Sequence, residues 1–249
     1  KRGVQKLVED NWNNDIMLVR APTGAGKTDA SLLWASRQIA AHKADRLVIA
    51  MPTRFTANAL SVNVAATLSE TGLYHSSAWY SKYSKVQNGE SDMTEALAQH
   101  KMAKLLATPI TVCTIDHLLM SLTLTKESHH LICSNLANSC VVIDEADFYD
   151  DFTLANILFL LKVLHKWNVP VMIMSASLPE SALQLYRKAG FDIESIIEDK
   201  DSDRYKKCFN IRKQIKYDNI QDINYQLEYC VDRGNAIIYL NTVDKAIKV

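Results

Sequence analysis

The fold is decided by one short stretch, Ala21–Thr28, which reads APTGAGKT. It follows an apolar run, Asp15–Arg20, that predicts a β-strand, and it opens a segment, Lys27–Lys43, with the pattern of a helix. A strand, this loop and a helix in succession are typical of a phosphate-binding loop, although Ala21 stands where the usual motif has its first glycine. A glycine-rich turn that only caps a helix is the alternative, and the three features together make it the weaker one.

The residue types of this loop indicate how a nucleotide is held. Gly24 and Gly26 permit a tight turn whose N–H groups point at phosphate oxygens, and the helix that follows adds its positive end. We expect Lys27 to reach the β- and γ-phosphates and Thr28 to ligate magnesium. Gln5, upstream, is predicted to read the adenine edge, with a surface glutamine as the alternative. The predicted nucleotide-binding residues are Gln5, Thr23, Gly24, Ala25, Gly26, Lys27 and Thr28.

A second apolar run, Val141–Ile143, ends in the adjacent carboxylates Asp144 and Glu145. This is the arrangement that a Walker B site needs. We expect Asp144 to complete the magnesium shell and Glu145 to orient or deprotonate the attacking water, so both are predicted catalytic residues together with Lys27. A solvated turn or a helix cap is the alternative. The phosphate loop upstream makes that alternative the weaker one.

Two further strand ends carry polar residues. Thr53 and Arg54, after a predicted strand at Arg46–Met51, and Thr114, after a weaker strand at Thr111–Cys113, suit contacts with nucleic-acid phosphates. An ordinary helix cap is the better interpretation of either segment taken alone. The aromatic residues of the segment Trp79–Lys85 give a minor hypothesis of base stacking, with a partly packed surface loop as the alternative.

The remaining pattern predicts an α/β fold with a parallel sheet flanked by helices. Further strands are expected at Cys140–Ile143, Val169–Met174 and Gly72–His75, and further helices at Arg54–Glu70, Met93–Lys104, Phe152–Trp167 and Pro179–Ala189. Residues 1–195 are expected to form a first lobe. A charged linker is predicted at 196–217, and the helix and strand within 218–249 are expected to begin a second lobe that stops short.

Composition restricts the class of protein. The chain has 249 residues, 48% of them hydrophobic, and 28 basic and 28 acidic side chains balance, so it is a globular protein without a broad basic field. Its five cysteines form no CxxC pair, which argues against a disulfide framework or a zinc site. Since no apolar run reaches the length of a membrane span, we expect a cytoplasmic protein of a reducing compartment, with no membrane partner.

The motifs occur in an order that resembles the first RecA-like lobe of superfamily-two helicases. The order is the P-loop, the PTR of Pro52–Arg54, the TIDH of Thr114–His117, the DEAD of Asp144–Asp147 and the SAS of Ser175–Ser177. The spelling is most similar to the helicase of type I CRISPR interference systems, also through Tyr149-Asp150 and Asn241-Thr242-Val243. The resemblance implies a second RecA-like lobe after the first, and Ser175, Ser177 and Asp147 as residues that couple the lobes.

This resemblance also implies an ATP- and Mg²⁺-dependent DNA helicase that moves 3′ to 5′ along the non-target single strand opened by a crRNA-guided surveillance complex in prokaryotes. The family has an HD nuclease domain, but no His-Asp dipeptide occurs here, so we expect no such nuclease in this chain. It was lost upstream, is carried on another subunit, or was never present. Asp147 departs from the family's usual histidine and keeps open an RNA helicase of the DEAD-box kind. A scaffold that binds ATP without turnover is the third reading.

Overall fold

The computed structural model describes residues 3–68, 71–83 and 90–200, together with the single positions Glu228, Thr242, Asp244 and Ile247. The chain separates into two units, Lys1–Tyr205 and Lys206–Val249. Apart from those single positions, the predicted linker beyond residue 200 and the predicted second lobe lie outside the described residues.

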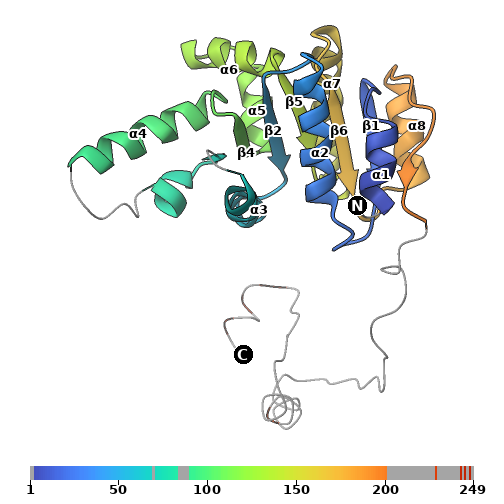
Figure 1. The fold of residues 1–249 in the computed structure, drawn as a ribbon, viewed down its shortest axis with the longest axis horizontal. Helices are drawn as coiled ribbons and strands as arrows, with labels where there is room; N and C mark the ends of the chain where they lie inside the picture. Colours follow the sequence, from blue (N-terminus) through green and yellow to red (C-terminus); the bar gives the residue numbers. More distant parts are fainter. Residues whose placement is uncertain are drawn as a thin grey trace. The chain divides into compact units, whose positions relative to one another are not determined.

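The described part of the first unit is built on a seven-stranded sheet with the order β3-β4-β2-β5-β6-β1-β7, in which neighbouring strands pair in parallel. The strands are β1 Ile16–Arg20, β2 Arg46–Met51, β3 Thr71–Tyr74, β4 Ile110–Thr114, β5 Ser139–Ile143, β6 Val171–Ser175 and β7 Ile197–Glu198. Parallel strands require crossover connections, so the helices lie on both faces of the sheet (Figure 1). The α/β fold with a parallel sheet is confirmed.

The crossover helices and shorter turns follow from the sequence pattern between the strands. The helices are α1 Gly3–Asp10, α2 Lys27–Ala40, α3 Arg54–Thr67, α4 Glu90–Lys104, α5 Ile115–Ser121, α6 Glu127–Ala137, α7 Asp151–Lys166 and α8 Glu180–Lys188. A π-helix occupies Trp79–Tyr83 and a 3₁₀ turn occupies Ala146–Phe148. Within the described residues, the six strands and five helices predicted for the first lobe are all present, with ends shifted by at most three residues. Helices α1, α5 and α6 are additional.

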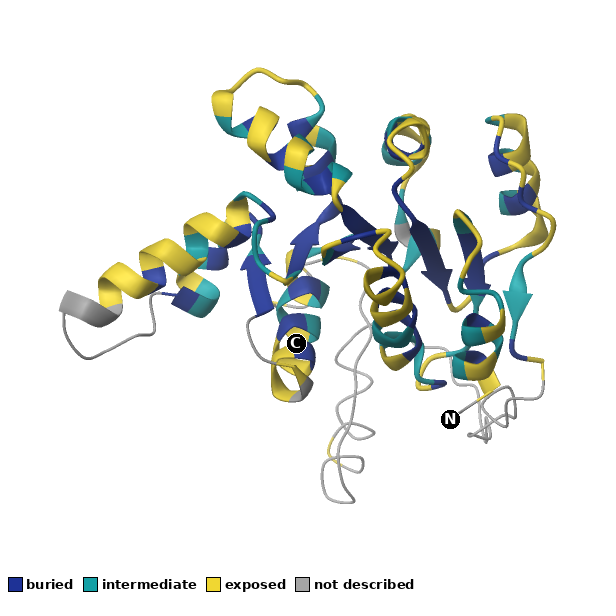
Figure 2. Cartoon of the chain, turned by 45° about the horizontal axis from the view of Figure 1, so that its top comes forward, coloured by how far each residue is buried: buried dark blue, intermediate teal, exposed yellow. Residues whose placement is uncertain are grey.

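Two apolar clusters, one on each face, hold the layers together. Successive strand residues point to opposite faces, so Met17 of β1 packs with α1, α2 and α3, whereas Leu18 packs with α7 and α8. The same alternation occurs in β6, where Met172 and Ile173 join opposite clusters. Figure 2 shows the strands as buried and the helices with one exposed side. A sheet buried on both faces can hold its carboxyl edge rigidly.

One domain prediction needs correction. Residues Ile197–Glu198, which composition assigned to the linker, pair with Val19–Arg20 as the edge strand β7. The Arg20 guanidinium donates to both carboxylate oxygens of Glu198, at 3.0 Å from Nε and 2.8 Å from Nη2. This bidentate pair fixes the edge strand by two charge-assisted hydrogen bonds. The sheet of the first lobe therefore extends past residue 196, where the linker was predicted to begin.

Candidate functional site

Five predicted motifs lie at the carboxyl ends of five neighbouring strands. Along the sheet, Thr114 ends β4, Thr53 and Arg54 follow β2, Asp144 follows β5, Ser175 ends β6, and the phosphate loop follows β1. Parallel strands end at the same edge of a sheet, and ligands of open α/β sheets bind at that edge. The topology therefore brings the predicted residues to one side of the molecule, although they are spread over more than 150 positions of the sequence.

The phosphate loop has the backbone that its glycines predict. Gly24 and Gly26 have φ values of 78° and 92°, a left-handed conformation that an L side chain disfavours. Ala21 is not among the described residues with positive φ. It is fully buried, and its N–H donates to the Ser175 carbonyl at 3.1 Å. This position continues the strand pairing of β1 with β6, so an alanine replaces the usual glycine here without strain.

The loop and the Walker B carboxylates line one open pocket of about 480 Å³, the nucleotide pocket. The loop and helix α2 contribute Thr23, Gly24, Gly26, Lys27, Thr28, Asp29 and Leu32, and the opposite side contributes Asp144, Glu145 and residues of α3. The Lys27 ammonium donates to the Ala21 carbonyl at 3.0 Å, so the lysine lies folded over its own loop. The structure thus brings together the predicted catalytic residues Lys27, Asp144 and Glu145.

Asp144 is the buried acid of this pocket, with 7% of its surface exposed. Burial raises its pKa to about 6, against the opposing effects of the Glu145 N–H, which donates to Oδ1 at 2.8 Å, and of the Lys27 charge. A desolvated carboxylate is stabilised by a cation. The carboxylate oxygens of Asp144 and the hydroxyl of Thr28 are hard ligands of the kind Mg²⁺ prefers, so the donor set fits this ion.

Glu145 has a strained backbone. Its φ of 52° is left-handed, which is uncommon for a residue other than glycine, and it directly precedes the 3₁₀ turn Ala146–Phe148. Such outliers persist only where the surrounding structure enforces them, and they concentrate at functional sites. The strain is consistent with a backbone held so that the Glu145 side chain faces the nucleotide pocket.

Asp147 links the DEAD and SAS motifs. The hydroxyls of Ser175 and Ser177 donate to its two carboxylate oxygens. Partial burial acts to raise the pKa of Asp147, but these hydrogen bonds outweigh it, and the pKa is lowered. The N-cap of α8 is Pro179 and Ser177 bonds to Asp147, so Ser177 does not cap the helix that follows it.

A second open pocket, the cationic pocket, has a volume of about 500 Å³ and is lined by the predicted nucleic-acid contacts. Its lining includes Thr53, Arg54, Thr114, Asp116, Lys104 and Lys126. Sequence reasoning missed both lysines because they lie outside the motifs, at the end of α4 and just before α6. With Arg54 they provide three cations at one hollow, which favours the binding of phosphate groups on an otherwise neutral chain.

The threonines of this second pocket differ in what their hydroxyls do. Thr53 is the N-cap of α3, and its Oγ1 accepts the Thr56 N–H at 3.2 Å, so the helix-cap interpretation holds for it. Thr114 precedes α5 without a side-chain cap bond. Arg54 donates weakly to the Ser76 and Ser77 hydroxyls, at 3.5 and 3.4 Å. Arg54, with only long hydrogen bonds, and Thr114, without a cap bond, are therefore better placed than Thr53 to bind a phosphate.

Gln5 lies on α1, where its amide donates to Asp29 at 3.4 Å. Asp29 lines the nucleotide pocket whereas Gln5 is not part of that lining. Gln5 therefore contacts a residue that lines the pocket without lining the pocket itself, and its contact with adenine stays a prediction. Ala25 is also absent from the lining, because its side chain is buried beneath the loop.

The base-stacking hypothesis for the aromatic segment is wrong for two of its three rings. Tyr83 is buried, and its hydroxyl is bonded to the backbone of Leu73. Trp79 is half-buried and stacks on Tyr83 at 6.3 Å between ring centroids. Tyr80 alone of the three is exposed, at 75%. These rings therefore pack β3 against α4, and Lys85 lies outside the described residues.

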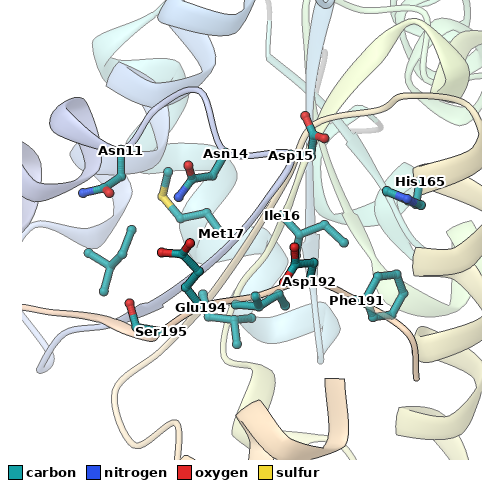
Figure 3. A pocket seen from close by; sticks show the side chains of 13 residues that line it. Asn11, Asn14, Asp15, Ile16, Met17, His165, Phe191, Asp192, Glu194 and Ser195 are labelled. Carbon is teal, nitrogen blue, oxygen red and sulfur yellow. The ribbon is translucent and has the colours of Figure 1, made fainter. Parts of the chain in front are cut away.

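A third hollow, of about 370 Å³, lies at the opposite edge of the sheet. Figure 3 shows Asp15, at the amino end of β1, with Asp192, Glu194 and Asn14 around it. None of the predicted site residues lines this hollow. Its position at the amino ends of parallel strands sets it apart from the edge where the motifs gather.

Comparisons with known proteins agree with this arrangement. The family model of the DEAD/DEAH box helicases matches residues 2–185. A CRISPR-associated nuclease/helicase Cas3 of Methanocaldococcus jannaschii is 28% identical over 249 residues, covering 95% of this chain and 33% of that protein. The crystal structure of T. fusca Cas3 with ADP matches with a TM-score of 0.62 and 28% identity, covering 76% of this chain and 22% of that one.

A chain in the structure of a CRISPR RNA-guided surveillance complex, pre-nicking, matches with a TM-score of 0.55 and 25% identity, covering 76% of this chain and 20% of that one. The chain thus spans a third or less of the length of these relatives. Within the described residues, no helix has the length and apolar character needed to cross a membrane.

Proposed function

Since this chain belongs to the DEAD/DEAH box helicase family, we propose that it is the ATP-binding motor lobe of a DNA helicase of type I CRISPR interference. The motor unwinds target DNA and reels the non-target single strand 3′ to 5′ for degradation. One observation carries the proposal: the nucleotide pocket and the cationic pocket open at the carboxyl edge of adjacent strands. The similarity to Cas3 proteins supports the CRISPR context.

Each residue of the nucleotide pocket has a defined task in this mechanism. Bound ATP supplies the phosphoryl group, and bound Mg²⁺ neutralises its negative charge. The backbone N–H groups at Gly24 and Gly26 and the ammonium of Lys27 orient and stabilise the phosphates. Thr28 and Asp144 are the proposed metal ligands. Glu145 orients the attacking water and accepts its proton, a task that suits a carboxylate fixed by its own backbone turn.

The cationic pocket holds the nucleic acid in this proposal. Arg54 and Thr114 contact the sugar–phosphate backbone, which fixes the position of the strand without reading its bases. Asp147, bonded to Ser175 and Ser177, links two motif loops and transmits cleft closure to the second lobe. The proposed partners are single-stranded DNA, a crRNA-guided surveillance complex and an HD nuclease domain or subunit, in the cytoplasm of a prokaryote. The surveillance-complex match supports the second of these.

An RNA helicase of the DEAD-box kind is the runner-up, favoured by the Asp147 spelling. A scaffold that binds ATP without turnover is the other alternative. Both share the phosphate loop and the Walker B carboxylates with the proposed motor, so the pockets by themselves do not separate the three. ATPase activity with and without nucleic acid separates them, because only the motors couple ATP turnover to a nucleic acid.

The deciding experiment is the magnesium-dependent ATPase activity of the natural full-length protein with single-stranded DNA, with single-stranded RNA and with neither. We expect stimulation by DNA, and a loss of about 10²-fold or more in Glu145→Gln, because general-base catalysis contributes that much. Stimulation by RNA alone would establish the runner-up. Turnover unchanged by both nucleic acids and by the Glu145 substitution would sink the motor proposal.

A further inference from the structure

Tyr149 has a buried hydroxyl without a hydrogen-bond partner among the described residues. The residue lies between the 3₁₀ turn Ala146–Phe148, which follows the Walker B carboxylates, and Asp150, the N-cap of α7. Buried hydroxyls are nearly always bonded, because leaving one without a partner costs stability. An orphaned O–H beside the Walker B turn therefore calls for an acceptor that another state of the protein provides.

The position of Tyr149 connects the two pockets. It packs against the apolar cluster that includes Cys113 at the end of β4 and Ile143 at the end of β5. Burial raises its pKa, and the negative charges of Asp144 and Asp116 raise it further, so the phenol stays protonated and remains a donor. Asp144 lines the nucleotide pocket and Asp116 lines the cationic pocket. Tyr149 thus packs beside the strand ends that carry the two pockets.

Of these two carboxylates, Asp116 is the better acceptor. Asp144 already accepts the Glu145 N–H on Oδ1, and its carboxylate faces the nucleotide pocket. The Asp116 side chain is exposed and has no hydrogen bond or ion pair within the described ranges, so it is free to reorient. It lies two residues after Thr114, which ends β4. The ends of β4 and β5 are two strands apart, or roughly 10 Å. A tyrosine anchored beside the β5 turn spans such a gap.

We propose that Tyr149 is a positioning residue that couples nucleic-acid binding to ATP hydrolysis. When a strand occupies the cationic pocket and shifts the turn after β4, the Tyr149 hydroxyl donates a hydrogen bond to Asp116. That bond fixes the 3₁₀ turn and with it the Glu145 backbone in the arrangement that hydrolyses ATP. Among the described residues, the Tyr149 hydroxyl makes no such bond. The inference rests on the proposed function, since it requires turnover that responds to nucleic acid.

The test is Tyr149→Phe in the natural full-length protein, with Tyr186→Phe as matched control. Tyr186 is also buried, lies on α8 and belongs to the same apolar cluster. With saturating single-stranded DNA we expect kcat for ATP to fall by about tenfold in Tyr149→Phe with KM for ATP unchanged, a size typical of coupling between sites. The melting temperature of its nucleotide-free form should not fall, because the hydroxyl makes no bond there. Tyr186→Phe should keep the wild-type stimulation.

Asp116 provides a second, independent test. If the two side chains share one bond, Asp116→Asn lowers stimulated turnover as well, and the double variant loses no more than Tyr149→Phe alone. Losses that multiply would overturn Asp116 as the acceptor. Full stimulation in Tyr149→Phe, or an equal loss in Tyr186→Phe, would overturn the role of Tyr149. Wild-type protein that no nucleic acid stimulates would instead contradict the proposed function, so the two failures are distinguishable.

Discussion

Replacing Asp144 by asparagine is expected to stabilise the nucleotide-free fold while it abolishes hydrolysis. Asp144 is 7% exposed, and burial raises its pKa from the ordinary 3.8 to about 6. A carboxyl with a raised pKa is harder to ionise in the folded protein than in the unfolded chain. Its charge therefore destabilises the fold at neutral pH, and a neutral side chain of the same shape removes that cost.

The size of the effect follows from the two pKa values. They differ by about 2, and each pKa unit corresponds to roughly 1.4 kcal/mol, which gives an upper bound of about 3 kcal/mol at pH 7. Well below pH 3.8 the carboxyl is protonated in both states and the cost vanishes; it grows between about pH 4 and 6 and is constant above. Asparagine keeps an oxygen for the Glu145 N–H but adds an N–H₂ group, so we expect about 1–3 kcal/mol.

Urea denaturation with EDTA and without nucleotide measures this difference, at about pH 3 and about pH 7.5. Asp45→Asn is the control, because Asp45 is exposed in the loop before β2 and such surface changes stay within about 0.5 kcal/mol. Asp144→Asn should be the more stable protein at about pH 7.5 and should lose this advantage at about pH 3. A variant less stable than the wild type at pH 7.5, or a difference independent of pH, would refute the argument that burial sets this pKa.

Three further substitutions test separate parts of the site. Lys27→Ala should abolish binding of ATP, measured by titration calorimetry, because the nucleotide pocket loses the ammonium proposed to bind the phosphates. Arg54→Ala should weaken binding to single-stranded DNA equally across sequences and reduce the slope of log affinity against log salt by about 1, as followed by fluorescence anisotropy. Asp147→Asn should cost about 1 kcal/mol at pH 7 in urea denaturation, because two serine hydroxyls donate to the ionised carboxylate. Its pKa is lowered in the fold, so this loss should disappear as the pH falls below 3.8.

The sequence predicts the nucleotide side of the site well because its chemistry depends on local order. A phosphate loop needs two glycines, a lysine and a hydroxyl in a fixed spacing between a strand and a helix, and all of them lie within eight residues. The strands could also be predicted from the sequence, since a sheet buried on both faces requires continuous apolar runs such as those of β2 and β5. These features need no tertiary information.

The parts that sequence reasoning missed depend on contacts between distant segments. The strand β7 has two residues in a charged region and is held by Glu198 pairing with Arg20, 178 positions earlier. Lys104 and Lys126 join the cationic pocket only because the end of α4 and the start of α6 meet at the pocket that also includes the end of β4. The sequence shows Tyr149 only as part of the Tyr149-Asp150 pair, whereas the lack of a partner for its buried hydroxyl depends on the packed structure. No local pattern signals any of the three.

The contacts of Asp147 bear on the choice between a DNA and an RNA motor. The fourth letter of the DEAD spelling was the main reason to keep an RNA helicase open, yet its side chain faces the hydroxyls of Ser175 and Ser177 and is absent from the lining of the cationic pocket. Those serines can donate to a carboxylate or to an imidazole nitrogen, so aspartate and histidine can serve the same link between loops. The identity of residue 147 therefore concerns how the DEAD and SAS motifs are joined. The nucleic acid is selected by groups that contact it, and the preference for DNA or RNA must be sought around Arg54 and Thr114.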